Sequence, residues 1–382
     1  MPYRESKYRT GVHMMIQYPD YNNSLVNLAC SLLKHFGTQP QHATLPILDL
    51  LLETRYTNVV VMLFDGMGSD ALSYHLPEDS FLRRHRTADI SSVFPSTTTA
   101  AITSIESGLT PAEHGWLGWS LYFSEIDKIV NALTNTEEGS GSQAADYHVA
   151  GKYLPYKNIV DIINETGKAK AYSVSPFGTN RVHRHEQLYK EVRKLCSTGD
   201  RKYIYTYWYQ PDSSMHDKGC RSTEAGEWIT AINKEVEDLC GDLHDTLIIV
   251  TADHGHCSLR YEIISDHPNI AKMLYRPVAV ECRAVCFYVK PEYHDSFPGA
   301  FHEAFGDNFM LLTRQEVFDR QLFGDGEAHP KLEELTGDFL AIAISDVGIV
   351  QHHGSNRFLS HHAGMTEEEM RIPFIVIESN DR

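Results

Sequence analysis

The chain has 382 residues, enough for one large domain with insertions or for two domains. Its hydrophobic fraction of 42% and its charged fraction of 22% are those of an ordinary globular protein and argue against a fibrous or low-complexity chain. The net charge of −17 at pH 7 argues against a general nucleic-acid-binding protein, because phosphate backbones attract clustered Lys and Arg.

The N-terminal residues 1–23 lack the apolar core of a signal peptide. No stretch approaches the roughly 20 apolar residues of a membrane span. The seven cysteines are scattered and include no C-x-x-C pair; Cys282 and Cys286 are close in sequence, but two separate buried thiols are the simpler interpretation. We therefore expect reduced cysteines, a cytoplasmic location and no membrane partner.

Helical and strand-like segments alternate along the chain. Residues 22–37 are expected to form a helix that begins at an Asn or Ser and ends at Gly37. Stretches such as 223–240 have the same helical pattern. Continuous apolar runs predict strands buried on both faces at 58–68, 169–175, 203–209, 246–255 and 372–378. The alternation predicts an α/β fold with a mostly parallel central sheet flanked by helices.

Two regions fit that alternation poorly. Residues 258–345 contain several prolines and mixed strand and helix signals, and we predict that they form an inserted cap subdomain. Residues 119–155 are polar and rich in Gly and Ser, and we predict a smaller excursion there. The catalytic core is then expected over 1–257 and 346–382, and substrate specificity is expected in the two irregular regions.

Possible metal ligands follow three of the predicted strands and precede a fourth. In an open α/β sheet, ligands bind at the carboxyl ends of the strands. We therefore expect the following side chains to meet at one rim: Asp65, Asp212, His216, Asp253, His254 and either His361 or His362. Three carboxylates and three imidazoles suit two zinc-like ions that keep open positions for a substrate.

A cluster of hydroxyl side chains, Thr97, Thr98 and Thr99, stands just before a helix-like stretch. Ser and Thr are favoured at such positions as helix caps. A hydroxyl there is also placed to act as a nucleophile, because a helix N-terminus favours anions such as a phosphoryl group. The two roles are compatible.

These segments together resemble the alkaline phosphatase superfamily, and most of all its nucleotide pyrophosphatase/phosphodiesterase branch. The matching segments occur in the family's order: "LFDGMG", "FPSTTTAAITSIESGLTPAEHG", "YWYQPDSSMHDKG", "VTADHGH" and "HAGMTEEEMRIPFIVI". The resemblance implies an alkaline phosphatase-like three-layer sandwich with a cap. It also implies two Zn²⁺ ions, although Mn²⁺ or another divalent metal would suit the same ligand types.

The resemblance assigns the ligands residue by residue. One zinc ion would bind Asp212, His216 and His362, with His361 as the alternative to His362. The other would bind a second set: Asp65, Asp253, His254 and the hydroxyl oxygen of Thr98. Thr98 is implied as the nucleophile because it lies ten residues before the glycine of "SGL" and four after the phenylalanine of "FPSTT".

One position departs from the family. Many diesterases of this branch have an Asn shortly after "HG" that holds a phosphoryl oxygen, whereas Trp119 stands there in this chain. The oxygen would then be held by a backbone N–H, a metal ion or another residue. The motif "SDHP", with Asp266 and His267, is not assigned as a source of ligands. His256 is not assigned as a ligand either: it is expected to touch the substrate or support a ligand, or else to pack or lie at the surface.

The implied activity is hydrolysis of a small phosphodiester or nucleotide-like substrate through a covalent phosphothreonine at Thr98. The alternatives within the same fold are a phosphomonoesterase, a phosphonate hydrolase and a manganese-dependent phosphomutase. A non-catalytic binding protein of this fold is disfavoured, because every candidate ligand and the nucleophile are present.

Overall fold

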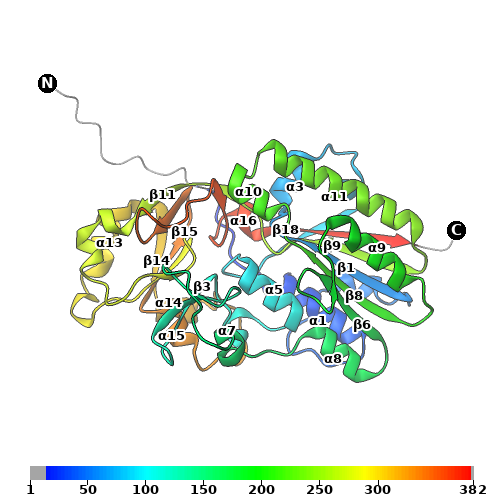
Figure 1. Cartoon of the computed structure of the whole chain (residues 1–382), viewed down its shortest axis with the longest axis horizontal. Coiled ribbons are helices and arrows are strands. Elements are labelled where there is room, and N and C mark those ends of the chain that lie inside the picture. The colour runs from blue at the N-terminus through cyan, green and yellow to red at the C-terminus, as the bar shows by residue number, and fades with distance from the viewer. Residues whose placement is uncertain (1–13, 380–382) are drawn as a thin grey trace.

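The computed structural model describes residues 14–379. Within them, two seven-stranded sheets form the two lobes of the molecule. Figure 1 shows how the two lobes are arranged. The larger sheet has the order β2-β18-β9-β1-β8-β6-β7. Its strands are β1 Asn58–Phe64, β2 Arg86–Ser91, β6 Lys170–Ser175, β7 Asn180–Arg181, β8 Lys202–Trp208, β9 Thr246–Thr251 and β18 Arg371–Ser379. β18 pairs antiparallel with both of its neighbours, and the other pairings are parallel.

Helices cover both faces of this sheet. One face carries α1 Leu25–His35, α5 Thr98–Ser107 and α8 Ile159–Thr166, and the other carries α3 Ser69–His75, α9 His185–Cys196 and α11 Thr223–Asp242 (Figure 1). The predicted three-layer α/β sandwich with a mostly parallel central sheet is therefore confirmed. The five predicted strands correspond to β1, β6, β8, β9 and β18.

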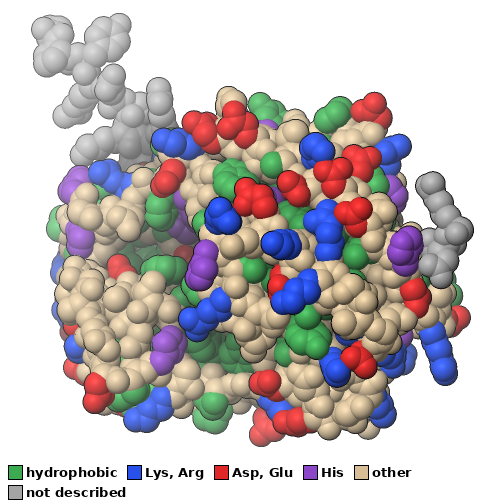
Figure 2. Space-filling view, turned by 45° about the vertical axis from the view of Figure 1, so that its right-hand side comes forward, with side chains coloured by type: hydrophobic (Ala, Val, Ile, Leu, Met, Phe, Trp, Pro, Cys, Tyr) green, Lys and Arg blue, Asp and Glu red, His purple; other side chains and the backbone are tan. Residues whose placement is uncertain are grey.

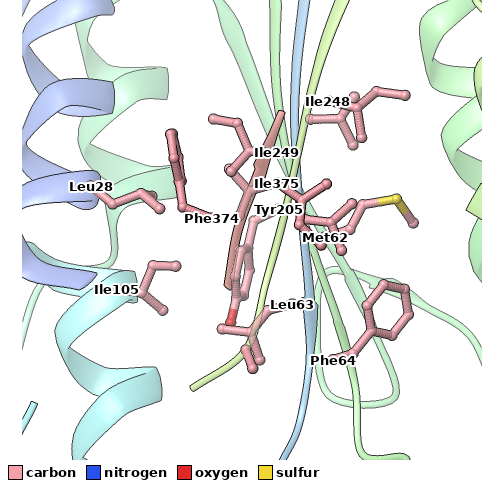
Figure 3. Close-up of a cluster of buried hydrophobic side chains, with 14 of the residues drawn as sticks. Leu28, Met62, Leu63, Phe64, Ile105, Tyr205, Ile248, Ile249, Phe374 and Ile375 are labelled. Carbon is pink, nitrogen blue, oxygen red and sulfur yellow. The ribbon is translucent and has the colours of Figure 1, made fainter. Parts of the chain in front are cut away.

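The central strands are apolar throughout because both of their faces are covered. Every residue of β1 and of β9 is buried. Figure 3 shows Leu28 of α1 and Ile105 of α5 beside Phe374 on one side of the sheet, and Met62 and Phe64 on the other. This packing holds the strand ends rigidly, and the candidate site lies there.

The predicted helix at 22–37 illustrates how local sequence sets an element's ends. Ser24 is the N-cap, and it forms a reciprocal capping box with Asn27. The helix α1 ends at His35, and Gly37 follows with a φ of 87°, a left-handed conformation that glycine adopts at little cost.

The smaller sheet joins the two regions that fit the sequence alternation poorly. Its order is β14-β15-β13-β12-β3-β4-β5, and Val280 of β12 pairs with Ser120 of β3. The strands are β3 Ser120–Phe123, β4 Lys128–Asn131, β5 Thr136–Glu137, β12 Ala279–Val280, β13 Ala284–Phe287, β14 Phe309–Thr313 and β15 Phe339–Ala343. Residues 119–155 and residues 258–345 thus contribute to the same lobe. The boundaries of a cap subdomain at residues 258 and 345 stay a prediction.

Shorter elements surround the sheets and connect them. Two small strand pairs, β10 with β17 and β11 with β16, lie outside both large sheets. These shorter elements are α2 Pro46–Leu51, α4 Phe81–Arg84, α6 Pro111–His114, α7 Val149–Tyr153, α10 Asp212–Lys218, α12 Pro268–Ala271, α13 Phe297–Phe305, α14 Arg314–Asp319, α15 Leu332–Thr336, α16 Glu367–Met370, β10 Cys257–Ser258, β11 Arg260–Ile263, β16 Val347–Val350 and β17 Ser360–His361.

All seven cysteines are unpaired, and Cys282 and Cys286 do not form a disulfide. Among residues 14–379, none of the helices combines the length and the apolar character that crossing a bilayer requires. Lys and Arg side chains are interspersed with Asp and Glu on the face shown in Figure 2, which therefore carries no extended patch of one sign.

Candidate metal centre and active site

The candidate ligands lie at the carboxyl ends of three adjacent strands. Asp65 directly follows β1, Asp212 begins α10 a few residues after β8, and Asp253 follows β9. β1 is hydrogen-bonded to β8 on one side and to β9 on the other, so these three ends share one rim. The backbone N–H of Asp212 donates to the carbonyl of Asp65 at 3.0 Å, which fixes the two segments against each other.

Asp65, Asp253 and His254 form the first candidate ligand group, with ligand atoms within 4.8 Å of one another. His254 Nε2 lies 3.3 Å from Asp65 Oδ1 and 3.4 Å from Asp253 Oδ2. Asp253 Oδ2 is buried and has no hydrogen-bond partner within the described part of the chain. A buried carboxylate oxygen without a donor is costly unless a cation binds it, so this group fits a metal ion.

The hydroxyl of Thr98 reaches this first group. Thr98 is the first residue of α5 and is only partly buried. Its Oγ1 lies 3.1 Å from His254 Nε2 and 3.4 Å from Asp65 Oδ1. Thr97 takes the N-cap position instead, and its hydroxyl donates to Glu281 Oε1 at 2.7 Å. Of the three threonines, Thr98 is therefore the one that both contacts the ligand group and is accessible.

Asp212, His216 and His362 lie together in a second group. Asp212 Oδ1 is 3.3 Å from His216 Nε2 and 3.7 Å from His362 Nε2. Both histidines also form a group with His361, again with ligand atoms within 4.8 Å of one another. Mixed imidazole and carboxylate ligands of this kind suit Zn²⁺ and related divalent metals.

Carbonyl groups orient the rings of this second group. His216 Nδ1 lies 2.9 Å from the carbonyl oxygen of Ser360, and His362 Nδ1 lies 3.2 Å from that of Ser96. A carbonyl only accepts hydrogen bonds, so each Nδ1 carries the proton. Each Nε2 therefore keeps its lone pair for a metal, the usual arrangement for ligating histidines.

Two further side chains support the carboxylates. Tyr207, on β8, donates its hydroxyl proton to Asp65 Oδ2 at 2.5 Å. The buried His256 has its Nε2 2.7 Å from Asp212 Oδ1 and its Nδ1 3.3 Å from the hydroxyl of Ser360. His256 thus contacts a candidate ligand, as expected for a supporting residue. Tyr207 was not singled out in the sequence, because it is one of several tyrosines in an aromatic strand.

The buried carboxylates attract positive charge. Burial, followed by the charge of Asp65, raises the pKa of Asp253 well above its usual value. Burial alone would lower the pKa of His254, but the carboxylates of Asp253 and Asp65 raise it to about 10. Asp65 likewise has a raised pKa because of burial and the nearby charge of Asp212. The first group therefore favours a cation, whether a proton or a metal ion.

The glycine of "DHG" permits a close approach of two backbones. A Cβ atom on Gly255 would lie 2.0 Å from the carbonyl oxygen of Glu368, and one on Gly68 would lie 2.5 Å from the Cα of Gly255. The backbone N–H of Gly255 also donates to the carbonyl of Glu369 at 2.8 Å. The turn after β9 is thus fixed against α16, which places Asp253 and His254 at the rim.

The site opens into a cleft with a volume of about 760 Å³. Four parts of the chain form its walls: the strand ends that carry the candidate ligands, the β3–β4 hairpin of the smaller sheet, residues 277–282 before β13, and residues 349–362. Among the residues that line it are Thr98, Trp119, Asp212, His216, Glu281, Phe358, His361 and His362. Trp119 is 43% exposed in this wall, and its side chain is therefore available to a ligand.

Asp266 and His267 of the motif "SDHP" are not part of this site. His267 Nε2 is 3.2 Å from Glu262 Oε2, and Asp266 Oδ1 is 2.8 Å from His353 Nε2. Neither Asp266 nor His267 belongs to a candidate metal group within the described residues.

Comparison with known proteins identifies the family. A family model described as "Type I phosphodiesterase / nucleotide pyrophosphatase" matches residues 59–274, which is more than half of the chain. No curated protein sequence matches the chain.

Solved structures with this fold share little sequence with the chain. Murine ectonucleotide pyrophosphatase/phosphodiesterase 5 is 16% identical, with a TM-score of 0.63 over 84% of this chain and 90% of that one. The human protein of the same name is 17% identical, with a TM-score of 0.63 over 84% and 87% of the chains. Phosphonoacetate hydrolase from Sinorhizobium meliloti 1021 is 18% identical, with a TM-score of 0.60 over 83% and 89%. These matches confirm the alkaline phosphatase-like fold, and the family match extends across the strands that carry Asp65, Asp212 and Asp253. The chain therefore belongs to the type I phosphodiesterase/nucleotide pyrophosphatase family of the alkaline phosphatase superfamily, and it is an enzyme of that hydrolase type.

Proposed function

We propose that this enzyme hydrolyses small phosphodiesters with Thr98 as its nucleophile and two zinc ions as its metals. The observation that carries the proposal is the position of Thr98. Its hydroxyl lies 3.1 Å from His254 Nε2 at the edge of a buried ligand group and faces a cleft large enough for a small substrate. One metal ion would bind Asp65, Asp253, His254 and the Thr98 oxygen. The other would bind Asp212, His216 and His362.

When bound, two such ions lower the pKa of a coordinated hydroxyl and neutralise charge on the phosphoryl oxygens. Thr98 then attacks the phosphorus atom in line with the leaving group. The bond from phosphorus to the leaving oxygen breaks as the bond to Thr98 Oγ1 forms, which releases an alcohol and leaves a phosphothreonine. Water hydrolyses this ester, and the products are a phosphate monoester and the restored threonine.

The start of α5 contributes to binding the phosphoryl group. Thr98 is the first residue of this ten-residue helix, where backbone N–H groups lack partners within the helix. A helix N-terminus favours anions through these donors and its dipole. This gives the chain backbone donors for a phosphoryl oxygen, in place of the Asn that many diesterases have where Trp119 stands.

The known structures support a small phosphorus-containing substrate. An inactive threonine-to-alanine variant of murine ectonucleotide pyrophosphatase/phosphodiesterase 5 was solved in complex with AMP. Phosphonoacetate hydrolase was solved in complex with phosphonoformate. These are ligands of those proteins, and they support the proposal that the present cleft accepts a ligand of similar size.

The first prediction concerns the nucleophile. Replacing Thr98 with Ala removes the attacking oxygen but leaves six of the seven proposed ligands, so we expect kcat to fall by about 10³-fold or more while metal remains bound. The measurement is kcat/KM of the zinc-loaded protein for an aryl phosphodiester and for the matching monoester, with metal content determined in parallel. Wild-type turnover by a fully loaded Thr98→Ala protein would exclude Thr98 as the nucleophile. A preference of the wild type for the monoester would favour a phosphomonoesterase instead.

A further inference from the structure

The helix α5 begins with a threonine whose side chain does not cap it. Thr97 is the N-cap residue, and its hydroxyl accepts no backbone N–H of the first turn. In α11, by contrast, the N-cap Ser222 accepts the backbone N–H of Ala225 at 3.2 Å. Ser and Thr are favoured at this position because they satisfy an N–H group that the helix itself leaves unpaired. The first turn of α5 therefore lacks the acceptor that its own sequence offers.

Three backbone N–H groups at this helix start have no partner. The first hydrogen bond of α5 runs from the N–H of Ala101 to the carbonyl of Thr97 at 2.9 Å. The N–H groups before it, those of Thr98, Thr99 and Ala100, donate to no acceptor that the described part of the chain supplies. Thr98 and Thr99 also line the cleft. These donors therefore lie where an anion bound beside the proposed nucleophile can use them.

Glu281 accounts for the orientation of the Thr97 hydroxyl. Oε1 of Glu281 accepts the hydroxyl proton of Thr97 at 2.7 Å and the backbone N–H of Trp119 at 2.8 Å. A threonine hydroxyl has one proton to donate, and the rotamer of the side chain follows the acceptor that takes it. The bond to Glu281 thus directs the hydroxyl toward the smaller sheet and not toward the N–H groups of α5.

The backbone around Glu281 is fixed. Val280, the preceding residue, has a φ of 79°, and this left-handed conformation is a clear outlier for a β-branched side chain. A Cβ on Gly118, which precedes Trp119, would lie 2.7 Å from Val280 Cγ1 and 2.8 Å from the carbonyl oxygen of Val280. Such a conformation persists only where the surroundings impose it, and it is concentrated at functional sites. Close packing therefore holds the carboxylate of Glu281 at a set place beside the start of α5.

We propose that Glu281 is a positioning residue that holds the Thr97 hydroxyl as a donor and thereby keeps the first turn of α5 uncapped. The unpaired N–H groups then bind a phosphoryl oxygen next to Thr98. Without this acceptor, the Thr97 side chain rotates and accepts an N–H of the first turn, as an N-cap threonine ordinarily does. This inference rests on the proposed function, because it assumes that the phosphoryl group is bound at Thr98.

The test removes the two partners separately and together. Glu281→Met removes the acceptor and leaves Thr97 free to cap α5, so kcat of the zinc-loaded protein for an aryl phosphodiester should fall by about 10²-fold, with zinc content unchanged. KM should change less than kcat, because the donors act mainly on charge that develops in the transition state. The inhibition constant of inorganic phosphate should rise by about tenfold.

The double variant gives the most specific readout. Thr97→Val keeps the shape of the side chain but removes the hydroxyl, so valine cannot cap the helix. Thr97→Val alone should therefore lower kcat less than Glu281→Met does. Added to Glu281→Met, it should raise kcat by about tenfold, because it removes the group that competes with the phosphoryl oxygen.

Two further variants separate the hydrogen bond from charge and from stability. Glu281→Gln retains an oxygen that accepts hydrogen bonds, so it should recover most of the kcat that Glu281→Met loses. Glu106→Met is the matched control. Glu106 is also a partly buried carboxylate that accepts two hydrogen bonds, from Tyr156 at 3.0 Å and Asn158 at 3.2 Å, and it lies on α5 but does not line the cleft. Glu106→Met should keep the wild-type kcat.

A measurement on the wild type needs no variant. Inorganic phosphate should slow the hydrogen exchange of the Thr99 and Ala100 amide protons of the zinc-loaded protein, followed by NMR, because a phosphate oxygen accepts from them. Unchanged exchange at saturating phosphate would overturn the inference, even if one of the variants fails to fold.

The inference is also wrong if Glu281→Met keeps the wild-type kcat, if the double variant is as slow as Glu281→Met, or if Glu281→Gln is no faster than Glu281→Met. An equal loss in Glu106→Met would overturn it as well, since the loss would then reflect destabilisation alone. These outcomes leave the proposed function intact as long as turnover still requires Thr98. If turnover does not require Thr98, the proposed function itself fails.

Discussion

His361 and His362 are adjacent, yet their environments differ. His362 is buried, its Nδ1 is bonded to the carbonyl of Ser96, and its Nε2 is directed at Asp212. His361 is less buried, and its Nδ1 accepts the backbone N–H of His362 at 2.9 Å. His361 Nδ1 also lies 3.1 Å from the carbonyl oxygen of His362, but that oxygen belongs to the next residue. The Ser96 carbonyl belongs to a distant segment and holds the ring of His362 against the site, so we favour His362 as the ligand.

The second prediction separates these two histidines. We expect His362→Ala to bind about one zinc ion fewer per chain than the wild type, because it removes one of the three proposed protein ligands of one metal. His361→Ala should keep the wild-type metal content and serves as the control. The measurement is zinc content after dialysis against a weak chelator. The reverse pattern would make His361 the ligand.

At the scale of the elements, the turn after β9 depends on a glycine. Gly255 lies against the carbonyl of Glu368, so that even a methyl group would overlap it. The facing segment is itself held by a buried ion pair, in which Arg283 donates to both carboxylate oxygens of Glu369 at 2.6 and 2.7 Å. The overlap is therefore relieved by movement of the turn that carries Asp253 and His254.

The third prediction follows from this contact. Gly255→Ala should lower the free energy of unfolding by about 1–3 kcal/mol through overpacking and weaken metal binding at the first ligand group. Gly241→Ala is the control, because a Cβ there meets no atom within 4 Å and lies in the helix α11. Urea titration and zinc competition with a chelator measure the two effects. Wild-type behaviour of Gly255→Ala would show that the turn does not position the ligands.

At the scale of the whole molecule, buried histidines make stability depend on pH. His185 packs among Phe64, Trp208 and Trp228, and burial lowers its pKa to about 4. Burial also lowers the pKa of His114 to about 3. Below about pH 6.5 the unfolded chain binds protons at these residues and the folded chain does not, so the stability that these two residues contribute is fully present above pH 6.5 and is lost as the pH falls toward 4.

The fourth prediction tests this dependence at one residue. His185→Phe keeps an aromatic ring in the cluster and removes the titrating group. Between pH 7 and pH 5 it should lose about 2 kcal/mol less unfolding free energy than the wild type, whatever its absolute stability. Urea titrations at a series of pH values measure the two curves, and protonation of the metal ligands affects both equally. Parallel curves would contradict the prediction.

The family and the fold class are determined largely by local sequence. Apolar runs at 58–68 and 246–255 predict strands because only a sheet covered on both faces buries them, and they form β1 and β9. The candidate ligands follow these runs, so the rule that ligands bind at strand ends predicted the rim before any contact was known. Short-range signals such as Ser24 and Gly37 likewise marked the ends of α1.

Contacts between distant segments are decided only by the tertiary structure. Residues 119–155 look like a separate excursion because the region is rich in Gly and Ser and its strands are short, yet Ser120 pairs with Val280 about 160 residues later in the smaller sheet. Tyr207 has no sequence signal, because its role arises from its contact with Asp65. The sequence by itself thus determined which residues are the candidate metal ligands and the candidate nucleophile, because motif and strand-end position are local. The walls of the cleft, and with them the substrate, depend on how three remote segments pack, which no local pattern encodes.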